Sequence, residues 1–283
     1  MKTAGKKRRY QYLLGDSARE AARLRAQARL WDPTAAALFD RLHVRRGWKV
    51  LEVGPGQGSL HLELRRRVQG PVDAVERSPV FARRLKVLCA RDGLGQGRLW
   101  QADLLDAPLP LGAYDLIFAR WVFLFLPDPK AHLRKLMGAL KTGGLLAIEE
   151  YHRETFALIP RPREWADLLA ADRAFFASQG GDASIGGELP ELYRQVGLQV
   201  VEIHPTLKTG RPASPVWNWL STYFLGLMDR YASFPPFSKA QATRLRRHWL
   251  AVGRQKTSLI IAPAVLDIVG RKRRRKTRRT ISR

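Results

Sequence analysis

Residues 49–60 read Lys-Val-Leu-Glu-Val-Gly-Pro-Gly-Gln-Gly-Ser-Leu, and this stretch decides the fold. Val50, Leu51 and Val53 predict a short buried strand, the alternating glycines predict a tight turn, and residues 60–64 predict the start of a helix. Glycine lacks a Cβ and lets a ligand lie directly against the backbone. The stretch therefore predicts a strand–turn–helix ligand site.

Two residues of this stretch restrict the kind of ligand. Glu52 ends the predicted strand, in the crevice where open α/β sheets bind their ligands, and its carboxylate can accept hydrogen bonds from a cationic amine. The dinucleotide-binding spacing Gly-x-Gly-x-x-Gly is absent, because Ser59 stands where its third glycine is required. A phosphate-binding loop is also excluded, since no Gly-Lys-Ser/Thr follows.

The acid and the glycines at Glu52, Gly54, Gly56 and Gly58 resemble those of the class I S-adenosylmethionine-dependent methyltransferases, small-molecule type. In that family they hold the methionine end of the cofactor. The resemblance implies S-adenosylmethionine as the cofactor. It also implies a three-layer, Rossmann-like α/β fold with a seven-stranded, mostly parallel sheet, an amino-terminal helical lid and helical insertions after strands five and six.

Later residues extend the resemblance along the predicted sheet. Glu76 ends the second predicted strand, where a carboxylate accepts hydrogen bonds from both hydroxyls of an adenosine ribose. Asp103 follows the third predicted strand. In the resembled family an acid here accepts from the adenine amino group, and the next residue, Leu104, packs on the ring. The resemblance also implies that Arg77 and Arg120 belong to the cofactor site.

The remaining elements complete the expected domain. Apolar runs predict further strands at 114–120, 145–151, 198–203 and 257–262. Before the first strand, the sequence predicts a helix over 18–31 capped by Asp16 or Ser17, and a second helix that begins at Asp32-Pro33 and ends at Leu42. We expect a basic tail at 1–10, a methyltransferase domain at 11–270 and a basic tail at 271–283, the domain being divided into a helical lid (11–44), a core (45–152), a lid insertion (153–187) and a carboxyl-terminal part (188–270).

The charge of the chain suggests a second kind of partner. The formal net charge is +25, and residues 1–10 and 271–283 supply five and nine of the basic residues without any acid. Like-charge tails of this kind are usually solvated and sometimes bind nucleic acid or anionic surfaces. Nucleic acid binding through the tails is therefore one expectation, beside a small-molecule acceptor.

Other features concern compartment and metal. No secretory signal is visible, and the apolar segment 216–228 is shorter than the ~20 residues that a membrane span needs, so we expect no transmembrane segment and a cytoplasmic protein. The single cysteine, Cys89, excludes a disulfide framework and a cysteine-built metal site, and its apolar surroundings predict a core position. No metal is expected.

Methyl transfer from a sulfonium is an in-line displacement, so the protein mainly aligns the reactants and excludes water. The acceptor is expected to be a small or lipid-like molecule. Its predicted pocket consists of Tyr12, Gln27, Trp121 and Phe123. Where the acceptor must lose a proton, the candidate bases by position are Glu150 and His152, with His132 on a predicted surface helix as a weaker candidate.

Alternatives stay open at this stage. The chain lacks the Asn/Asp-Pro-Pro-aromatic motif of enzymes that methylate base amines, and Cys89 lies too early to act as a pyrimidine nucleophile. An RNA methyltransferase that uses the basic tails is still an alternative. A non-catalytic RNA- or membrane-surface-binding protein with a methyltransferase-like fold is another. The aromatic segment 215–228 predicts core packing, a substrate wall or the face of a homodimer.

Overall fold

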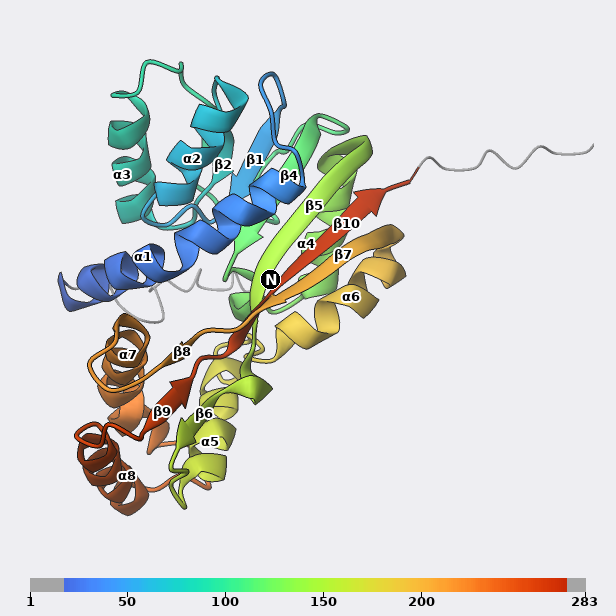
Figure 1. Cartoon of the computed structure of the whole chain (residues 1–283). Helices are drawn as coiled ribbons and strands as arrows, with labels where there is room; N and C mark the ends of the chain where they lie inside the picture. The colour runs from blue at the N-terminus through green and yellow to red at the C-terminus, as the bar shows by residue number, and fades with distance from the viewer. Residues whose placement is uncertain (1–17, 274–283) are drawn as a thin grey trace, which may run out of the picture.

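A seven-stranded sheet forms the centre of the molecule (Figure 1) in a computed structural model that describes residues 18–273. Its strand order is β3-β2-β1-β4-β5-β10-β7; the first five strands are parallel, and β10 is antiparallel to both of its neighbours. The strands are β1 (Val50–Val53), β2 (Asp73–Val75), β3 (Leu99–Trp100), β4 (Tyr114–Arg120), β5 (Leu140–His152), β7 (Leu198–Thr206) and β10 (Ala264–Lys272). The predicted seven-stranded, mostly parallel sheet is confirmed.

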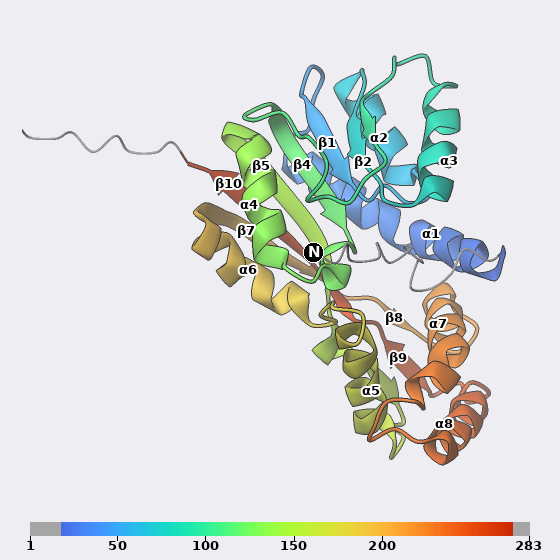
Figure 2. The same ribbon diagram turned by 180° about the vertical axis from the view of Figure 1, so that it is seen from behind.

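Helices cover both faces of this sheet, because side chains alternate between the two faces along each central strand. In β4, Leu116 and Phe118 pack in the cluster that holds α1 and α2 residues, whereas Ile117 and Ala119 pack in the cluster that holds α4 and α6 residues. Figure 1 shows α1 in front of the sheet, and Figure 2 shows α4 and α6 on the opposite side. The helices are α1 (Ala18–Arg41), α2 (Ser59–Val68), α3 (Pro79–Cys89), α4 (Pro129–Ala139) and α6 (Ile185–Val196). Cys89 lies buried against α3 and β2 residues, as predicted.

A second group of elements, the cap module, lies beyond the carboxyl ends of the parallel strands (Figure 1). It is inserted after β5 and after β7, which confirms the predicted helical insertions after the fifth and sixth strands. A three-stranded antiparallel sheet of order β6-β9-β8 joins its helices. Its elements are η2 (Arg153–Thr155), β6 (Ala157–Ile159), α5 (Trp165–Ala177), β8 (Thr209–Gly210), α7 (Pro215–Tyr231), α8 (Lys239–Val252) and β9 (Leu259–Ile261). Buried aromatic rings from several of these elements, including Trp165, Phe224 and Trp249, form its core.

The carboxyl-terminal strands differ from the prediction. The segment 257–262 was predicted as the seventh strand of the main sheet, but its residues 259–261 form β9 of the cap module, and the main sheet is completed by β10. An acid is unusual in a buried strand, and Asp267 of β10 is buried. Its carboxylate accepts a hydrogen bond from Arg41 Nη2 at 2.5 Å, which stabilises it there. The predicted basic tail also begins too early, because Arg271 and Lys272 pair with β5 and β7 as part of β10.

The amino-terminal helices also differ from the prediction. One helix, α1, runs through Pro33 where two helices were expected. Proline removes one backbone donor from a helix interior, and here packing outweighs that loss, since Trp31, Ala35 and Leu38 on either side of Pro33 are completely buried. The predicted caps Asp16 and Ser17 lie outside the described residues. Among residues 18–273, none of the helices is long and apolar enough to cross a membrane.

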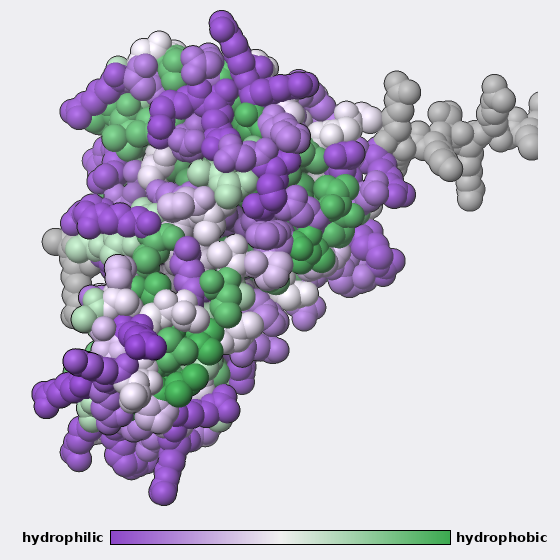
Figure 3. All heavy atoms as spheres, in the orientation of Figure 1, coloured by the Kyte–Doolittle hydropathy of each residue, from purple (hydrophilic) through white to green (hydrophobic). Residues whose placement is uncertain are grey.

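Most of the surface is hydrophilic on the face shown in Figure 3, with hydrophobic patches between the charged side chains. Strand β7 is an edge of the main sheet and exposes Val201 and Ile203. The homodimer expected from the sequence stays a prediction.

Candidate functional site

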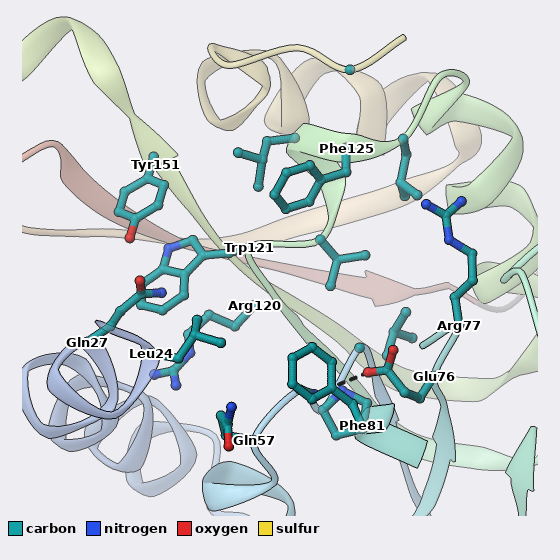
Figure 4. A pocket seen from close by; sticks show the side chains of 18 of the residues that line it. Leu24, Gln27, Gln57, Glu76, Arg77, Phe81, Arg120, Trp121, Phe125 and Tyr151 are labelled. Atoms are coloured by element: carbon teal, nitrogen blue, oxygen red, sulfur yellow. Dashed lines mark hydrogen bonds between the residues drawn. The ribbon is translucent and has the colours of Figure 1, made fainter. Parts of the chain in front are cut away.

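One cavity of about 630 Å³ lies where the carboxyl ends of the parallel strands meet the cap module. Its volume is in the range of pockets that bind small molecules and cofactors. The turn after β1, the ends of β2 and β4, the helix α1 and the cap helices α5 and α7 all contribute to its wall. Figure 4 shows side chains from both ends of this cavity.

The glycine turn after β1 needs its glycines for geometry. Gly54, Gly56 and Gly58 all have positive φ, at 67°, 53° and 84°. A Cβ on Gly54 would lie 2.7 Å from Val122 Cγ2, closer than two carbon atoms can approach without displacement. Gly54 and Gly56 line the cavity, while Gly58 caps the amino end of α2. The turn therefore presents bare backbone to a ligand.

The carboxylate of Glu76 lies beside this turn (Figure 4). Its Oε2 accepts from the backbone N–H of Gly56 at 3.2 Å, and its Oε1 accepts from that of Ser78 at 2.7 Å. Burial raises the pKa of Glu76, and the two backbone hydrogen bonds oppose that rise. Each carboxylate oxygen can accept more than one hydrogen bond, so acceptor capacity remains for two hydroxyl groups.

Glu52 also lines the cavity, and the structure gives it a partner that the sequence did not indicate. His61, on the first turn of α2, places Nδ1 at 2.9 Å from Glu52 Oε2, and both side chains are buried. Burial lowers the pKa of His61, but hydrogen bonds to Cys89 and Glu52 and the charge of Glu52 outweigh this and raise the pKa to about 9. His61 therefore fixes the orientation of the Glu52 carboxylate. A histidine on the buried face of a helix carries no sequence pattern that marks such a role.

Asp103 and Leu104 form the far end of the cavity wall, after β3. Asp103 accepts from the backbone N–H of Leu105 and from Arg77 Nη1, both at 3.1 Å. Leu104 is buried and faces the cavity. His132, expected on the surface, is instead buried on α4, with Nε2 at 3.9 Å from Asp103 Oδ1.

Arg120 ends β4, and Trp121 follows it directly; both line the cavity. Arg120 Nη2 donates to Asp32 Oδ1 at 2.5 Å. Trp121 has a φ of 53°, a conformation that costs energy for a bulky residue and that occurs mostly at functional positions. Tyr151 stacks on the Trp121 ring at 5.0 Å between centroids, and the Arg120 guanidinium also lies over it at 4.6 Å. The ring is therefore covered by protein groups.

The other predicted pocket residues separate into two groups. Gln27 of α1 lines the cavity and accepts from Arg23 Nη1 at 2.6 Å and from Trp219 Nε1 at 3.4 Å. Phe123 is completely buried in η1 (Phe123–Phe125) and does not line the cavity, whereas its neighbours Val122 and Leu124 do. Tyr12 lies outside the described residues.

The two candidate bases are not brought to the cavity wall. Glu150 is fully buried, and its carboxylate accepts from the backbone N–H groups of Leu124 at 3.2 Å and Tyr151 at 3.0 Å. Burial raises the pKa of Glu150 to about 7. His152 is half-buried at the end of β5. Neither side chain lines the cavity that holds the other candidate residues.

Several cavity residues were not predicted from the sequence. They come from α1, from the end of β5 and from the cap module, and comprise Arg23, Tyr151, Arg153, Phe176, Trp219 and Tyr223. The aromatic density of segment 215–228 was the one available signal, and its meaning depended on which side chains face inward. Among the described residues, no group of three or more histidine, cysteine or acidic side chains is arranged to hold a metal ion.

Comparisons with known proteins agree with this geometry. Residues 51–148 match the family described as a methyltransferase domain. The trans-aconitate 2-methyltransferase of Azoarcus sp. (strain BH72) is 37% identical over 145 residues, which are 50% of this chain and 55% of that protein. The nocamycin O-methyltransferase of Saccharothrix syringae is 24% identical over 212 residues, 66% of this chain and 73% of that protein.

A solved structure shares the fold. A solved structure of a methyltransferase candidate from Bacillus halodurans C-125 superposes with a TM-score of 0.59 at 15% identity, covering 85% of this chain and 100% of that one. The chain spans 38% to 55% of the length of the trans-aconitate 2-methyltransferases that it matches. Residues 51–148 therefore match a methyltransferase domain, and together with the sheet topology they support a class I S-adenosylmethionine-dependent methyltransferase fold. Enzymes of this class take their methyl group from S-adenosylmethionine.

Proposed function

We propose that this chain transfers the methyl group of S-adenosylmethionine to a small organic acceptor. One observation carries the proposal: four adjacent parallel strands, β3-β2-β1-β4, deliver Asp103, Glu76, Glu52 and Arg120 from their carboxyl ends to a single cavity. The edge of an open α/β sheet at these ends is where such folds bind their ligands.

The residues at this edge fit the parts of the cofactor. In our proposal Glu52 and the glycine turn hold the methionine end, with Arg120 nearby, and Glu76 accepts hydrogen bonds from the ribose hydroxyls. Asp103 and Leu104 then receive the adenine, with Arg77 holding the Asp103 carboxylate. One buried atom supports a bound group here, because Gln57 Oε1 faces this end without a hydrogen-bond partner among the described residues.

The rest of the cavity suits the task of positioning. When bound, S-adenosylmethionine supplies an activated methyl group on a sulfonium centre. The helix α1 and the cap module cover the opposite side of the cavity, with Gln27 and Trp219 linking the two by a hydrogen bond of 3.4 Å. Covering the site aligns the acceptor and excludes water, which are the main demands of an in-line displacement.

The relatives support a small-molecule acceptor, because trans-aconitate and nocamycin appear in the names of the two most informative ones. The alternative of an RNA acceptor depends on the basic tails, which lie outside the described residues except for 271–273. The lipid-like acceptor that the sequence left open is compatible with the aromatic cap.

Calorimetric titration with S-adenosylmethionine, S-adenosylhomocysteine and NAD tests the proposal. We expect binding of the first two ligands and none of NAD. Replacing Glu76 by alanine removes hydrogen bonds from a charged acceptor and should weaken S-adenosylhomocysteine binding about tenfold to a hundredfold. Glu191→Ala, which removes an exposed acid on α6, is the matched control and should bind normally. Equal binding by both variants would refute the assignment of Glu76.

A further inference from the structure

The acidic side chains along the cavity wall are confined to one half of it. All the acids that line it, Glu52, Glu76 and Asp103, stand on the half formed by the ends of β1, β2 and β3. The half formed by α1, the end of β5 and the cap module contributes Arg23 and Arg153, and among the side chains that the structure describes, those of residues 22–273, it contributes no carboxylate or imidazole. The cofactor end therefore combines these acids with Arg77 and Arg120, whereas the charged side chains described at the opposite end, which we call the acceptor end, are both arginines.

Arg153 is held in place from behind. It is 9% exposed, and its Nη1 donates to Asp172 Oδ2 at 2.6 Å. Asp172 also accepts from the Tyr231 hydroxyl at 2.7 Å and does not line the cavity. The guanidinium lies 4.7 Å from the ring centre of Phe176. An arginine keeps its charge at any ordinary pH, so this network places a fixed positive group at the cavity wall.

Arg23 approaches the same place from α1. Its guanidinium lies 5.5 Å from the centre of the Tyr223 ring, and that of Arg153 lies 5.9 Å from the same centre. Arg153 Nη2 also donates to the Tyr223 hydroxyl at 3.5 Å. Two guanidinium groups from distant parts of the chain thus converge on one aromatic ring at the acceptor end.

The remaining wall of the acceptor end is apolar. Phe176, Trp219, Leu220 and Phe224 supply it. With no carboxylate or imidazole to take a proton here among the side chains that the structure describes, the wall favours an acceptor that arrives already ionised. Guanidinium groups match carboxylates in geometry, because both are planar and can form paired hydrogen bonds.

We propose that the methyl acceptor is a carboxylate with an apolar body, whose oxyanion binds at Arg23 and Arg153. This inference rests on the proposed methyl transfer and adds the chemical class of the acceptor. The apolar body lies against the aromatic residues of the cap module, and the negative charge is matched by the basic end of the cavity.

Matched ligand pairs test this recognition directly. Benzoate and benzamide, phenylacetate and phenylacetamide, and octanoate and octanamide differ only in the charged group, and each is titrated into protein saturated with S-adenosylhomocysteine. We expect at least one carboxylate to bind about tenfold to a hundredfold more tightly than its amide. Methyl transfer from radiolabelled S-adenosylmethionine should show the same preference.

Variants assign the preference to these arginines. Arg23→Gln should reduce carboxylate affinity about tenfold or more and leave amide affinity unchanged. Because Arg153→Gln alone leaves Asp172 buried without its cation, the double variant Arg153→Gln with Asp172→Asn serves as the second test. Arg244→Gln removes an exposed arginine of α8 and is the control for net charge.

The outcomes separate the two proposals. If S-adenosylhomocysteine does not bind, the proposed function fails and the acceptor class fails with it. If S-adenosylhomocysteine binds but every amide binds as tightly as its carboxylate, or none of the carboxylates binds, only the acceptor class is refuted. A carboxylate preference that survives in both arginine variants also refutes it.

Discussion

The two ends of the cavity are built in different ways. At the cofactor end, contacts join neighbours on adjacent strands, as when Glu76 accepts from Gly56, twenty residues away. At the acceptor end, Trp219 donates to Gln27 across 192 residues of chain, and Tyr231 reaches Asp172 across 59. The first end depends on the backbone at the carboxyl ends of adjacent strands, and the second depends on the packing of the cap module against α1. The cofactor end is therefore determined by the order of the strands, whereas the acceptor end is determined by contacts between segments far apart in the chain.

Removing the buried ion pair at the acceptor end should have the largest effect on stability. Arg153→Gln leaves the carboxylate of Asp172 buried without its cation, which typically costs about 3–5 kcal/mol. Urea denaturation followed by circular dichroism measures this loss. The double variant with Asp172→Asn should recover much of it, because both charges are then absent. No recovery would mean that Arg153 acts through packing and not through its charge.

The cofactor end should show its own dependence on pH. The pKa of His61 is about 9 in the folded protein and 6.5 in the unfolded chain. The stabilisation of the fold by protonated His61 is therefore fully present below pH 6.5 and is lost as the pH rises through 9. The whole change in the free energy of unfolding is on the order of 3 kcal/mol. Unfolding curves between pH 6 and 10 should show it, and His61→Gln should flatten the slope. His204→Gln, at an exposed position in β7, should keep the slope.

A smaller effect tests the backbone of the glycine turn. Gly54→Ala places a Cβ against Val122 and a side chain in a left-handed conformation, whose strain alone costs about 1–2 kcal/mol. Gly143, with a φ of 85° and open space around it, is the matched control. Both alanine variants should lose the strain energy in thermal denaturation. Only Gly54→Ala should also weaken S-adenosylmethionine binding, and equal binding by the two would contradict the role of the turn.

The smallest effect on stability is expected on the surface, away from both ends of the cavity. Arg244 and Glu164 form an ion pair at 2.8 Å on the outside of the cap module, with the arginine 56% exposed. Water screens such pairs, so Arg244→Gln should change stability by about 0–1 kcal/mol. A large shift in melting temperature would show that the outer surface of the cap module, and not only its buried network, holds it together.

The cofactor end could be predicted from the sequence because its residues follow strands in a fixed register. Glu52, Glu76 and Asp103 each end or follow an apolar run, and parallel strands bring such positions to one edge. His61 could not be predicted in this way, since its role depends on the direction of a single buried side chain. The same holds for Trp121 and Phe123, two residues apart, of which only the first faces the cavity.

The cap module could not be predicted at this level. Its short strands β8 and β9 pair across about fifty residues of chain, and neither has a pattern that separates it from a loop or from a strand of the main sheet. Residues 264–272 contain an acid, a glycine and two basic residues, so the sequence did not predict that they form the strand that completes the main sheet. Long-range pairing decided both assignments.

The position of β10 has a consequence for how the protein is made. Within the described chain β10 is the last strand, yet it lies between β5 and β7, and β7 pairs with the sheet only through it. During synthesis, β1 to β5 can pair as they leave the ribosome, whereas β7 has no neighbour until residues 264–272 have emerged. Asp267 then bonds to Arg41 of α1, so the final strand joins the first helix in the same step. Closure of the sheet therefore waits until residues 264–272 have been translated.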